Sequence, residues 1–221
     1  FENNSATIRG GGLSNWDAMP SLIDTTVCGN DAPGSGITSQ IYNSSGSSWH
    51  DLGGNSVDNV CVYHHFVSPS DNLHQVIADA NSGEHIRLAP GTHSRAGINL
   101  AGKDLTISGS LNSDGSHATT INANGSASVF IFEDNASSNT VLKNLIITGG
   151  NAPNGAGIYV YHGGTPYFEN LHITGNNGGN GGGMCIYYSS PTLVNCRFTN
   201  NHASGTERGG GGLMMWKQAY P

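Results

Sequence analysis

Acidic side chains with basic neighbours are the first residues in this sequence that could do chemistry. Two or three carboxylates on adjacent elements could serve as general acid and base on a glycosidic bond, or hold a calcium ion. When the repeats described below are aligned, Glu133 falls opposite Tyr161 and Asp134 opposite His162, so the acidic pair does not continue into the next repeat. The sequence therefore predicts no catalytic residues. The nearest approach to a catalytic group is formed by Lys103, Asp104, Glu133, Asp134, Lys143 and Glu169.

Ten histidines raise the question of a metal site. The adjacent pair His64 and His65 is the best candidate, but neighbours on a strand point to opposite faces. A zinc site also needs three or four ligands in one place. We interpret the pair as exposed polar residues in a connecting loop, and we predict neither a metal nor any other cofactor.

Aromatic residues recur at matching places along the chain. Tyr161, Tyr187 and Trp216 share one outward position in the aligned repeats, and a tryptophan in the N-terminal part falls on the same row. Such a row could pack against a neighbouring copy, bind the faces of sugar rings, or stack on itself within the chain. All three alternatives stay open at this point. The residues concerned are Trp16, Tyr159, Tyr161, Tyr187, Tyr188 and Trp216.

The four cysteines fall into two pairs. Cys28 and Cys61 flank a stretch rich in Gly, Ser and Asn, where a disulfide would contribute roughly 3–4 kcal/mol by closing the loop. We expect this bond and, with it, an extracellular location, with two free thiols as the alternative. Strand alternation predicts that Cys196 faces inward and Cys185 outward, which disfavours a bond between them.

Internal repeats indicate the architecture that must position these residues. Residues 12–30, 157–177 and 183–201 align, and residues 212–221 begin a fourth copy. Each copy has a Gly, a strand of about four residues, a turn that ends in Pro, a second strand, and then Asn or Gly. The period is about 25 to 30 residues, which is typical of a solenoid.

Alternation within the strands predicts which side chains face the interior. Short strands cannot bury an apolar face alone, but coils stacked about 4.8 Å apart close a continuous core. Asn at the turns suits left-handed backbone positions and can form side-chain ladders between coils. The sequence thus predicts an all-β parallel β-helix. Its expected inward residues are Leu145, Ile147, Ile158, Val160, Leu171, Ile173, Met184, Ile186, Cys196, Phe198, Leu213 and Met215.

One segment departs from the strand pattern. Leu73, Val76, Ile77 and Ala80 follow a helical spacing, so a short capping helix is expected near residues 71–80. Its N-cap would be Ser70 or Asp71. Placed before a first strand at Ile86–Leu88, the helix would cover the exposed edge at one end of the solenoid.

Composition excludes two classes of partner. The net charge is −7 with only eight Lys and Arg residues, so the chain has no basic surface for nucleic acid. No apolar run approaches the roughly 20 residues of a membrane helix. We therefore predict neither nucleic-acid binding nor a membrane-spanning segment.

Several motifs carry a resemblance to known repeat proteins. "FENN", "FEDN" and "FTNN", with "GGGL", "GAGI" and "GGGM", resemble the repeat motifs of polymorphic outer-membrane proteins. The helix before "LAPGTH" and the "CGN…DLGGN…C" ending resemble right-handed parallel β-helix proteins of the pectin-lyase-like superfamily. This resemblance implies a right-handed, three-faced coil on a secreted or surface protein. It implies no single activity, and the Gly-His-Gly and Arg-Ile-Lys signatures of pectin hydrolases are absent.

The two ends of the sequence match each other. We expect residues 1–61 to form a terminal coil and closing loop, residues 62–70 to connect, and residues 71–221 to form a β-helix with an open C-terminal end. Residues 1–61 could cap a neighbouring copy, cap their own chain, or belong to an upstream module of a longer protein. The residues expected at an end-to-end contact are Phe1, Leu13, Leu22, Leu213, Met215 and Pro221.

These observations favour a non-catalytic, extracellular or surface-displayed structural protein that assembles with itself, head to tail or laterally. A protein that binds or degrades polysaccharides is the alternative.

Overall fold

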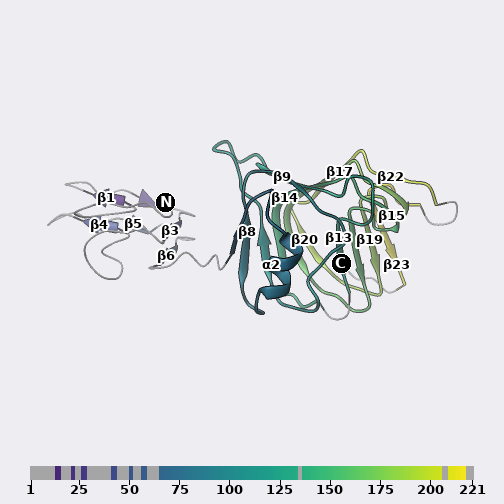
Figure 1. The fold of residues 1–221 in the computed structure, drawn as a ribbon, viewed down its shortest axis with the longest axis horizontal. Helices are drawn as coiled ribbons and strands as arrows, with labels where there is room; N and C mark the ends of the chain where they lie inside the picture. The colour runs from purple at the N-terminus through teal and green to yellow at the C-terminus, as the bar shows by residue number, and fades with distance from the viewer. Residues whose placement is uncertain are drawn as a thin grey trace. The chain divides into compact units, whose positions relative to one another are not determined.

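The computed structural model divides the chain into two compact units, residues 1–62 and 63–221. It describes residues 65–133, 136–205 and 209–217, together with the backbone of six short strands in the first unit. Figure 1 shows the second unit as a stack of strands that climbs from β8 to β23, with one helix at its beginning.

The second unit is a parallel β-solenoid of about five turns, made of three ladders of stacked strands. Every strand pair within these ladders is parallel, as expected when successive coils stack in one direction. The first ladder, which we call the aromatic sheet, contains β10 (Ile98–Asn99), β13 (Phe130–Phe132), β16 (Ile158–Tyr161), β19 (Met184–Tyr187) and β23 (Leu213–Trp216).

The other two ladders complete the coil. The main path of the long sheet contains β7 (His65–Val67), β8 (His85–Leu88), β11 (Thr106–Ser108), β14 (Val141–Thr148), β17 (Tyr167–Thr174) and β20 (Thr192–Val194). Three further strands belong to the same sheet: β9 (Gly91–Ser94), β12 (Thr119–Asn122) and β21 (Arg197–Thr199). β9 pairs with β12, β12 with β14, and β21 with β17. The short sheet contains β15 (Asn151–Asn154), β18 (Asn177–Asn180) and β22 (His202–Ala203).

Side chains from these ladders meet in one core. Leu145 is in register with Leu171, and Ile158 with Met184, so apolar residues lie above one another from coil to coil. The predicted inward face is confirmed for eight side chains that are at most 1% exposed: Leu145, Ile147, Ile158, Val160, Leu171, Ile173, Met184 and Ile186.

Four predicted core residues lie at the end of the stack and are less buried. Cys196, Phe198 and Leu213 are half-buried against the core, whereas Met215 is 50% exposed. In the part of the chain that the structure describes, β20, β21 and β23 each pair on one side only. The last coil therefore leaves its inner face partly open.

Cys185 has the predicted outward position, yet it is buried. The register places Cys185 beside Tyr159 and Met214, on the outer row of the aromatic sheet as predicted. Its side chain is nevertheless only 2% exposed. The Cys185 side chain points outward but does not contact solvent, because larger neighbouring side chains on the outer face of the sheet cover it.

The helix α2 (Leu73–Asp79) covers the first end of the core, as predicted, with Leu73, Ile77 and Ala80 buried. Its N-cap is Asn72, whose side chain accepts a hydrogen bond from the backbone N–H of Gln75 at 3.4 Å. The prediction of Ser70 or Asp71 was wrong by one or two positions, because the Asp71 carboxylate instead accepts from the backbone N–H of Ser68 at 2.7 Å.

A strand precedes this helix, which the sequence did not indicate. β7 lies within the stretch expected only to connect, and it pairs in parallel with β8. His65 is therefore a half-buried strand residue rather than an exposed loop residue. The predicted first strand at Ile86–Leu88 is the second strand of the long sheet.

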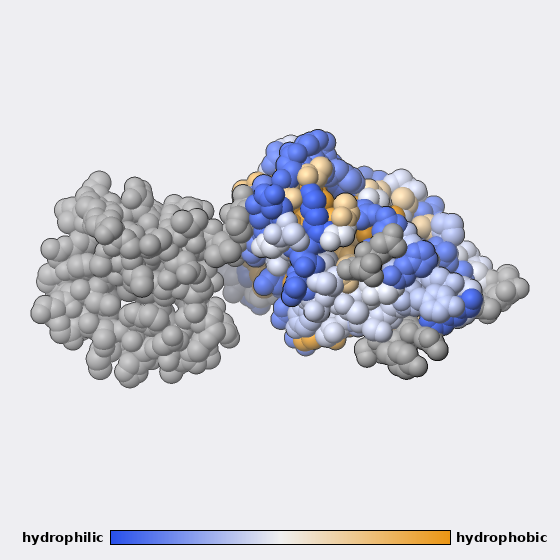
Figure 2. All heavy atoms as spheres, turned by 90° about the horizontal axis from the view of Figure 1, so that it is seen from below, coloured by the Kyte–Doolittle hydropathy of each residue, from blue (hydrophilic) through white to orange (hydrophobic). Residues whose placement is uncertain are grey.

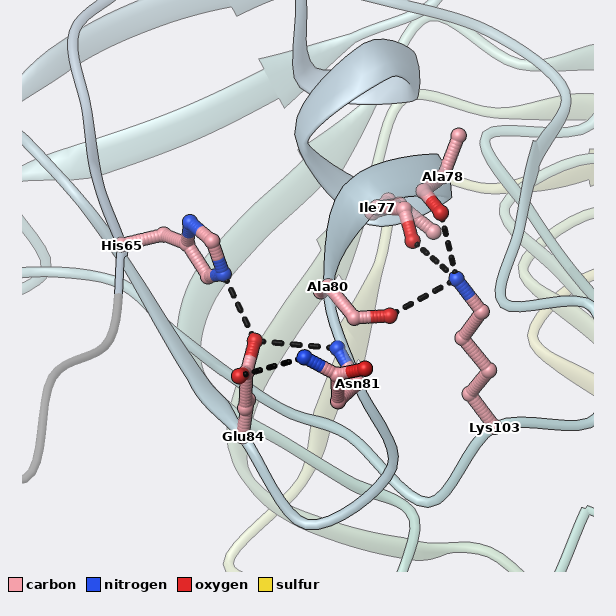
Figure 3. Close-up of polar contacts among 7 residues, drawn as sticks. All are labelled: His65, Ile77, Ala78, Ala80, Asn81, Glu84 and Lys103. Carbon is pink, nitrogen blue, oxygen red and sulfur yellow. Dashed lines mark hydrogen bonds and ion pairs between the residues drawn. The ribbon is translucent and has the colours of Figure 1, made fainter.

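Two polar contacts fix this end of the solenoid (Figure 3). Lys103 Nζ donates to the carbonyls of Ile77, Ala78 and Ala80, at 2.8, 2.7 and 2.8 Å, and so satisfies the last turn of α2. The Glu84 carboxylate pairs with His65 Nε2 at 2.7 Å and accepts from the backbone and side-chain N–H groups of Asn81.

Asparagines shape the turns between strands, as predicted. Asn144, Asn170 and Asn195 are in the left-handed region, with φ of 59°, 48° and 52°. Asn170 Nδ2 donates to Asn144 Oδ1 at 2.9 Å, which links two coils. In a second ladder, Asn176 Nδ2 donates to Asn201 Oδ1 at 3.0 Å.

The described strands of the first unit form two sets of three. Its strands are β1 (Leu13–Asn15), β2 (Ser21–Leu22), β3 (Thr26–Cys28), β4 (Ile41–Asn43), β5 (His50–Asp51) and β6 (Ser56–Asp58). β1 pairs with β4, β2 with β5 and β3 with β6, all in parallel. The stretch expected to be a closing loop thus supplies a second coil.

Candidate functional site

One candidate site is the outer face of the aromatic sheet, at its C-terminal end. Tyr161 is in register with Tyr187, and Tyr187 with Trp216, which confirms the predicted row within the second unit. Trp16 lies outside the described residues. We define the aromatic surface as Tyr159, Tyr161, His162, Tyr187, Tyr188, Trp216 and Lys217.

The rings of this surface contact one another. Tyr159 and Tyr161 stack with centroids 4.6 Å apart, and Tyr187 lies 5.0 Å from Trp216. Lys217 Nζ lies 5.0 Å from the Trp216 centroid and 5.5 Å from that of Tyr188, within cation–π range. Stacking within the chain is therefore one role of the row, and it leaves Tyr188 44% exposed at the surface.

Among the described residues, four other than Gly and Asn have a positive φ, and three of them lie on this surface, the fourth being Ala101. His162, Tyr188 and Lys217 have φ of 59°, 49° and 53°, one such residue directly after each of three stacked strands. A left-handed conformation costs about 1–2 kcal/mol for a residue with a Cβ, and Gly or Asn adopts it more easily. Comparable turns elsewhere use Asn144 and Asn170. Strain of this kind concentrates at functional sites.

The acidic residues considered for catalysis do not come together here. Glu133 lies at the far end of the row, where its carboxylate accepts from the Tyr161 hydroxyl and from Asn99 Nδ2. Asp104 accepts instead from Ser137 Oγ at 2.6 Å, in a different ladder. Lys103 is engaged with α2, and Asp134 lies outside the described residues. Across residues 65–133, 136–205 and 209–217, no three His, Cys, Asp or Glu side chains are grouped for a metal.

The two cysteines of the second unit are free thiols. Burial raises the pKa of Cys185 to about 11, and burial also raises the pKa of Cys196. A thiol nucleophile needs a lowered pKa and access to solvent. Cys196 therefore packs against the core and Cys185 packs on the outer row of the aromatic sheet, and neither is suited to act as a nucleophile.

A second candidate site is the open end of the solenoid. We define the end cluster as Leu193, Phe198, Leu213 and Met215, which come from β20, β21 and β23. Other large exposed apolar residues are scattered, such as Phe66 at 66%. The face in Figure 2 is mostly polar, with hydrophobic atoms in small areas. The end cluster differs because Leu193, Phe198 and Leu213 pack against the core and Met215 is in register with the buried Ile186.

The repeat alignment relates this end to the first unit. It matches β1 to β23, β2 to β20, and β3 to β21, and the structure has strands at all three pairs of positions. Leu13 thereby corresponds to Leu213, Leu22 to Leu193, and Val27 to Phe198. Of the predicted contact residues, Phe1 and Pro221 lie outside the described residues.

The disulfide prediction concerns the first unit, and Cys61 lies outside the described residues. Cys28 is the last residue of β3 and is in register with Asp58 of β6. Cys61 follows Asp58 by three positions, so the chain can bring it close to Cys28. The bond stays a prediction.

Sequence reasoning missed His162 and Lys217. Both follow an aromatic residue of the predicted row directly, at the same place as Tyr188. That shared position could have identified them, but alternation alone assigns no face to a residue that ends a strand.

Comparison with known proteins identifies no relative: no family model, curated protein or solved structure matches this chain. The resemblance to pectin-lyase-like and outer-membrane repeats therefore rests on the short motifs alone. The coarser conclusion, a parallel β-solenoid, holds independently of any family. Among the described residues, no helix has the length and apolar character needed to span a membrane.

Proposed function

We propose that this protein is a non-catalytic, extracellular structural solenoid whose open end receives the first unit of a neighbouring copy. Subunits would then join head to tail into a fibre. A contact that uses two different surfaces forms an open filament unless its rotation closes a ring.

The match between the three strands of the end coil and β1–β3 carries this proposal. A parallel strand can add to an open edge, so β1 would continue the aromatic sheet on β23. β2 and β3 would continue the two halves of the long sheet that end in β20 and β21, one level above the coil that β23 begins. Leu13, Leu22 and Val27 would follow Leu213, Leu193 and Phe198 in the core. Burying one such apolar side chain contributes about 1.5–3 kcal/mol.

The length of the connecting chain favours a cap from another copy. If residues 1–61 capped their own chain, β6 would lie seven strand spacings from β7, or about 34 Å. His65 follows Asp58 by seven positions, which span at most about 25 Å when fully extended. The connection is therefore too short for the first unit to cap the open end of its own chain.

Cross-linking in trans tests the proposal. The alignment places Ser14 opposite Met214, so Ser14→Cys and Met214→Cys variants, purified separately and mixed under mild oxidation, should form a disulfide-linked dimer. Both variants carry Cys185→Ser as well, because Cys185 is in register with Met214 and its thiol would compete for the new cysteine.

Thr92→Cys replaces Met214→Cys in the control mixture, because Thr92 is an exposed strand residue near the other end of the stack. It should give no dimer with Ser14→Cys. Absence of the dimer from the Ser14→Cys and Met214→Cys mixture, with both proteins folded and at high concentration, would refute the contact. Electron microscopy of the unmodified protein should show filaments.

The strained residues of the aromatic surface favour a second candidate function, polysaccharide binding. A sugar ring has apolar C–H faces and polar edges, and the surface combines aromatic rings, among them the exposed Tyr188, with the ammonium group of Lys217. The ladder repeats about every 4.8 Å along the stack, which suits an extended chain of pyranose rings. Trp216→Ala and Tyr187→Ala should abolish retention on a polysaccharide column, whereas an unresponsive glycan array would remove this function.

A further inference from the structure

A polar pocket lies on the long sheet, and none of its lining residues belongs to the aromatic surface or to the end cluster. Its volume is about 550 Å³, within the usual range for small-molecule sites. Its wall is formed by turn residues before β8, β11 and β14 and by the first residues of β11 and β14, so three consecutive coils contribute to it. We call it the Asp104 pocket. It is lined by Ser82, Gly83, Asp104, Thr106, Ser138, Asn139 and Val141.

The framework of this pocket is fixed by hydrogen bonds. Gly83 N–H donates to the Asp104 carbonyl at 2.6 Å, and Asp104 N–H donates to Ser82 Oγ at 2.8 Å. The Asp104 carboxylate is held through Oδ1, which accepts from Ser137 Oγ at 2.6 Å and from Thr140 Oγ1 at 3.4 Å. A ligand would therefore meet an oriented carboxylate and would order few groups on binding.

Several polar groups of the pocket are left for a ligand. Among the described residues, nothing donates to Asp104 Oδ2, and the side chains of Thr106, Ser138 and Asn139 make no hydrogen bond. Together they offer a carboxylate oxygen, two hydroxyls and an amide. The half-buried Val141 supplies an apolar area beside them.

The polar groups that line the Asp104 pocket indicate which class of ligand it can bind. The lining contains a carboxylate and no Lys, Arg or His, so it disfavours phosphate, sulfate and uronate groups. A carboxylate oxygen can accept from the adjacent hydroxyls of a sugar in strong, charge-assisted hydrogen bonds. The amide and hydroxyls can both donate and accept, and Val141 suits the C–H face of a ring.

We propose that the Asp104 pocket binds a neutral or amino pyranose through a vicinal pair of hydroxyls. The sugar could be free in solution or could be the end of a glycan, since both present the same ring. This site would work independently of the aromatic surface and of the end-to-end contact.

Saturation-transfer NMR with the full chain tests the site. The probes are methyl pyranosides of glucose, galactose, mannose and glucosamine, with methyl glucuronide as the anionic comparison. We expect saturation of at least one neutral or amino sugar and none of the glucuronide. If a methyl glycoside gives no signal but a disaccharide with the same terminal ring does, the site is supported and its ligand is the end of a glycan.

Variants connect binding to the pocket. Asp104→Asn should weaken the affinity about tenfold or more, because a charge-assisted acceptor is lost. Asn139→Ala should weaken the affinity severalfold. Because Asn139 is exposed, this substitution should not affect folding, so the loss would report on binding. Thr92→Ala, an exposed strand residue outside the pocket lining and the aromatic surface, should leave the affinity unchanged. Absence of transfer from every probe, or equal binding by wild type, Asp104→Asn and Asn139→Ala, would overturn the proposal.

Discussion

Lys103 Nζ lies 2.8 Å from the Ile77 carbonyl and joins the last turn of α2 to a coil of the solenoid. The same ammonium group serves the carbonyls of Ala78 and Ala80. One side chain from the following coil thus satisfies three acceptors that the helix leaves open.

Removing this ammonium should weaken the cap of the solenoid. Lys103→Met keeps much of the aliphatic chain but leaves three carbonyls without their donor, so we expect a loss of about 1–3 kcal/mol in the free energy of unfolding. Urea denaturation followed by circular dichroism measures it. Lys143→Met, on an outward position of β14, is the matched control and should change stability by less than about 0.5 kcal/mol. Equal effects of the two variants would contradict the capping role.

Glu84 should make this end of the protein sensitive to acid. Hydrogen bonds from Asn81, then the contact with His65, lower the pKa of Glu84 from 4.5 to about 2. A carboxyl group with a lowered pKa in the folded state contributes stability above its unfolded pKa and loses it on acidification. The contribution should therefore disappear as the pH falls from about 4.5 to about 2.

Thermal melts of wild type and Glu84→Gln across that pH range provide the measurement. The variant should have the lower melting temperature near neutral pH, and the gap should close in acid. A gap that stays constant with pH would show that Glu84 acts through packing rather than through its charge. Asp79→Asn, on the exposed face of α2, controls for the general effect of removing a carboxylate.

Cys185 should resist thiol reagents in the folded protein. Its pKa is raised to about 11 by burial, so almost no thiolate is present near neutral pH. Alkylation with iodoacetamide followed by peptide mass spectrometry should find Cys185 unmodified in native protein and fully modified in urea. Rapid native labelling of Cys185 would contradict the burial. The half-buried Cys196 is expected to label between these extremes, since its side chain is more accessible.

The turn at Asn144 should need both the side chain and the conformation of Asn. Asn144→Ala removes the acceptor of the Asn170 hydrogen bond and also forces alanine into a left-handed conformation, so we expect a loss of about 2–3 kcal/mol. Asn144→Gly removes the acceptor only and should recover part of that loss. Chemical denaturation of both variants measures the difference, and a glycine variant no more stable than the alanine variant would exclude strain as a cause.

Met215 should matter for assembly more than for stability. Its side chain is 50% exposed in the single chain, so Met215→Asp should change the free energy of unfolding only slightly. A charge at the proposed contact should nevertheless prevent the cross-link between the Ser14→Cys and Met214→Cys proteins. Leu111→Asp alters a similarly exposed apolar residue away from the end cluster and should cross-link normally. Loss of cross-linking in both variants would argue against a specific contact.

Much of the fold was predictable because the repeats constrain one another. Alternation in a single strand such as Ile158–Tyr161 is a weak signal, but the same pattern at Met184–Tyr187 fixes the register and the inward face. The capping helix followed from the spacing of Leu73 and Ile77. Handedness rests on the resemblance alone.

The strand β7, the N-cap of α2 and the Asp104 pocket depend on contacts that the repeat pattern does not predict. β7 has only three residues, too few for an alternating pattern to reveal it, and it joins the sheet where β8 offers an open edge. The N-cap at Asn72 reflects a choice among three neighbouring polar residues. Asp104 and Asn139 are far apart in sequence, and only the stacking of coils brings them to one pocket.

β7 and β23 lie at opposite ends of the coil stack, which has a mechanical consequence for any fibre built from this chain. Tension between the two ends would act along the ladder hydrogen bonds, since these run across the strands from coil to coil. Coils would then detach one after another from an end. Each detachment would release the residues between positions such as Ile158 and Met184, roughly 90 Å of extended chain. Such a fibre would lengthen stepwise under load instead of snapping.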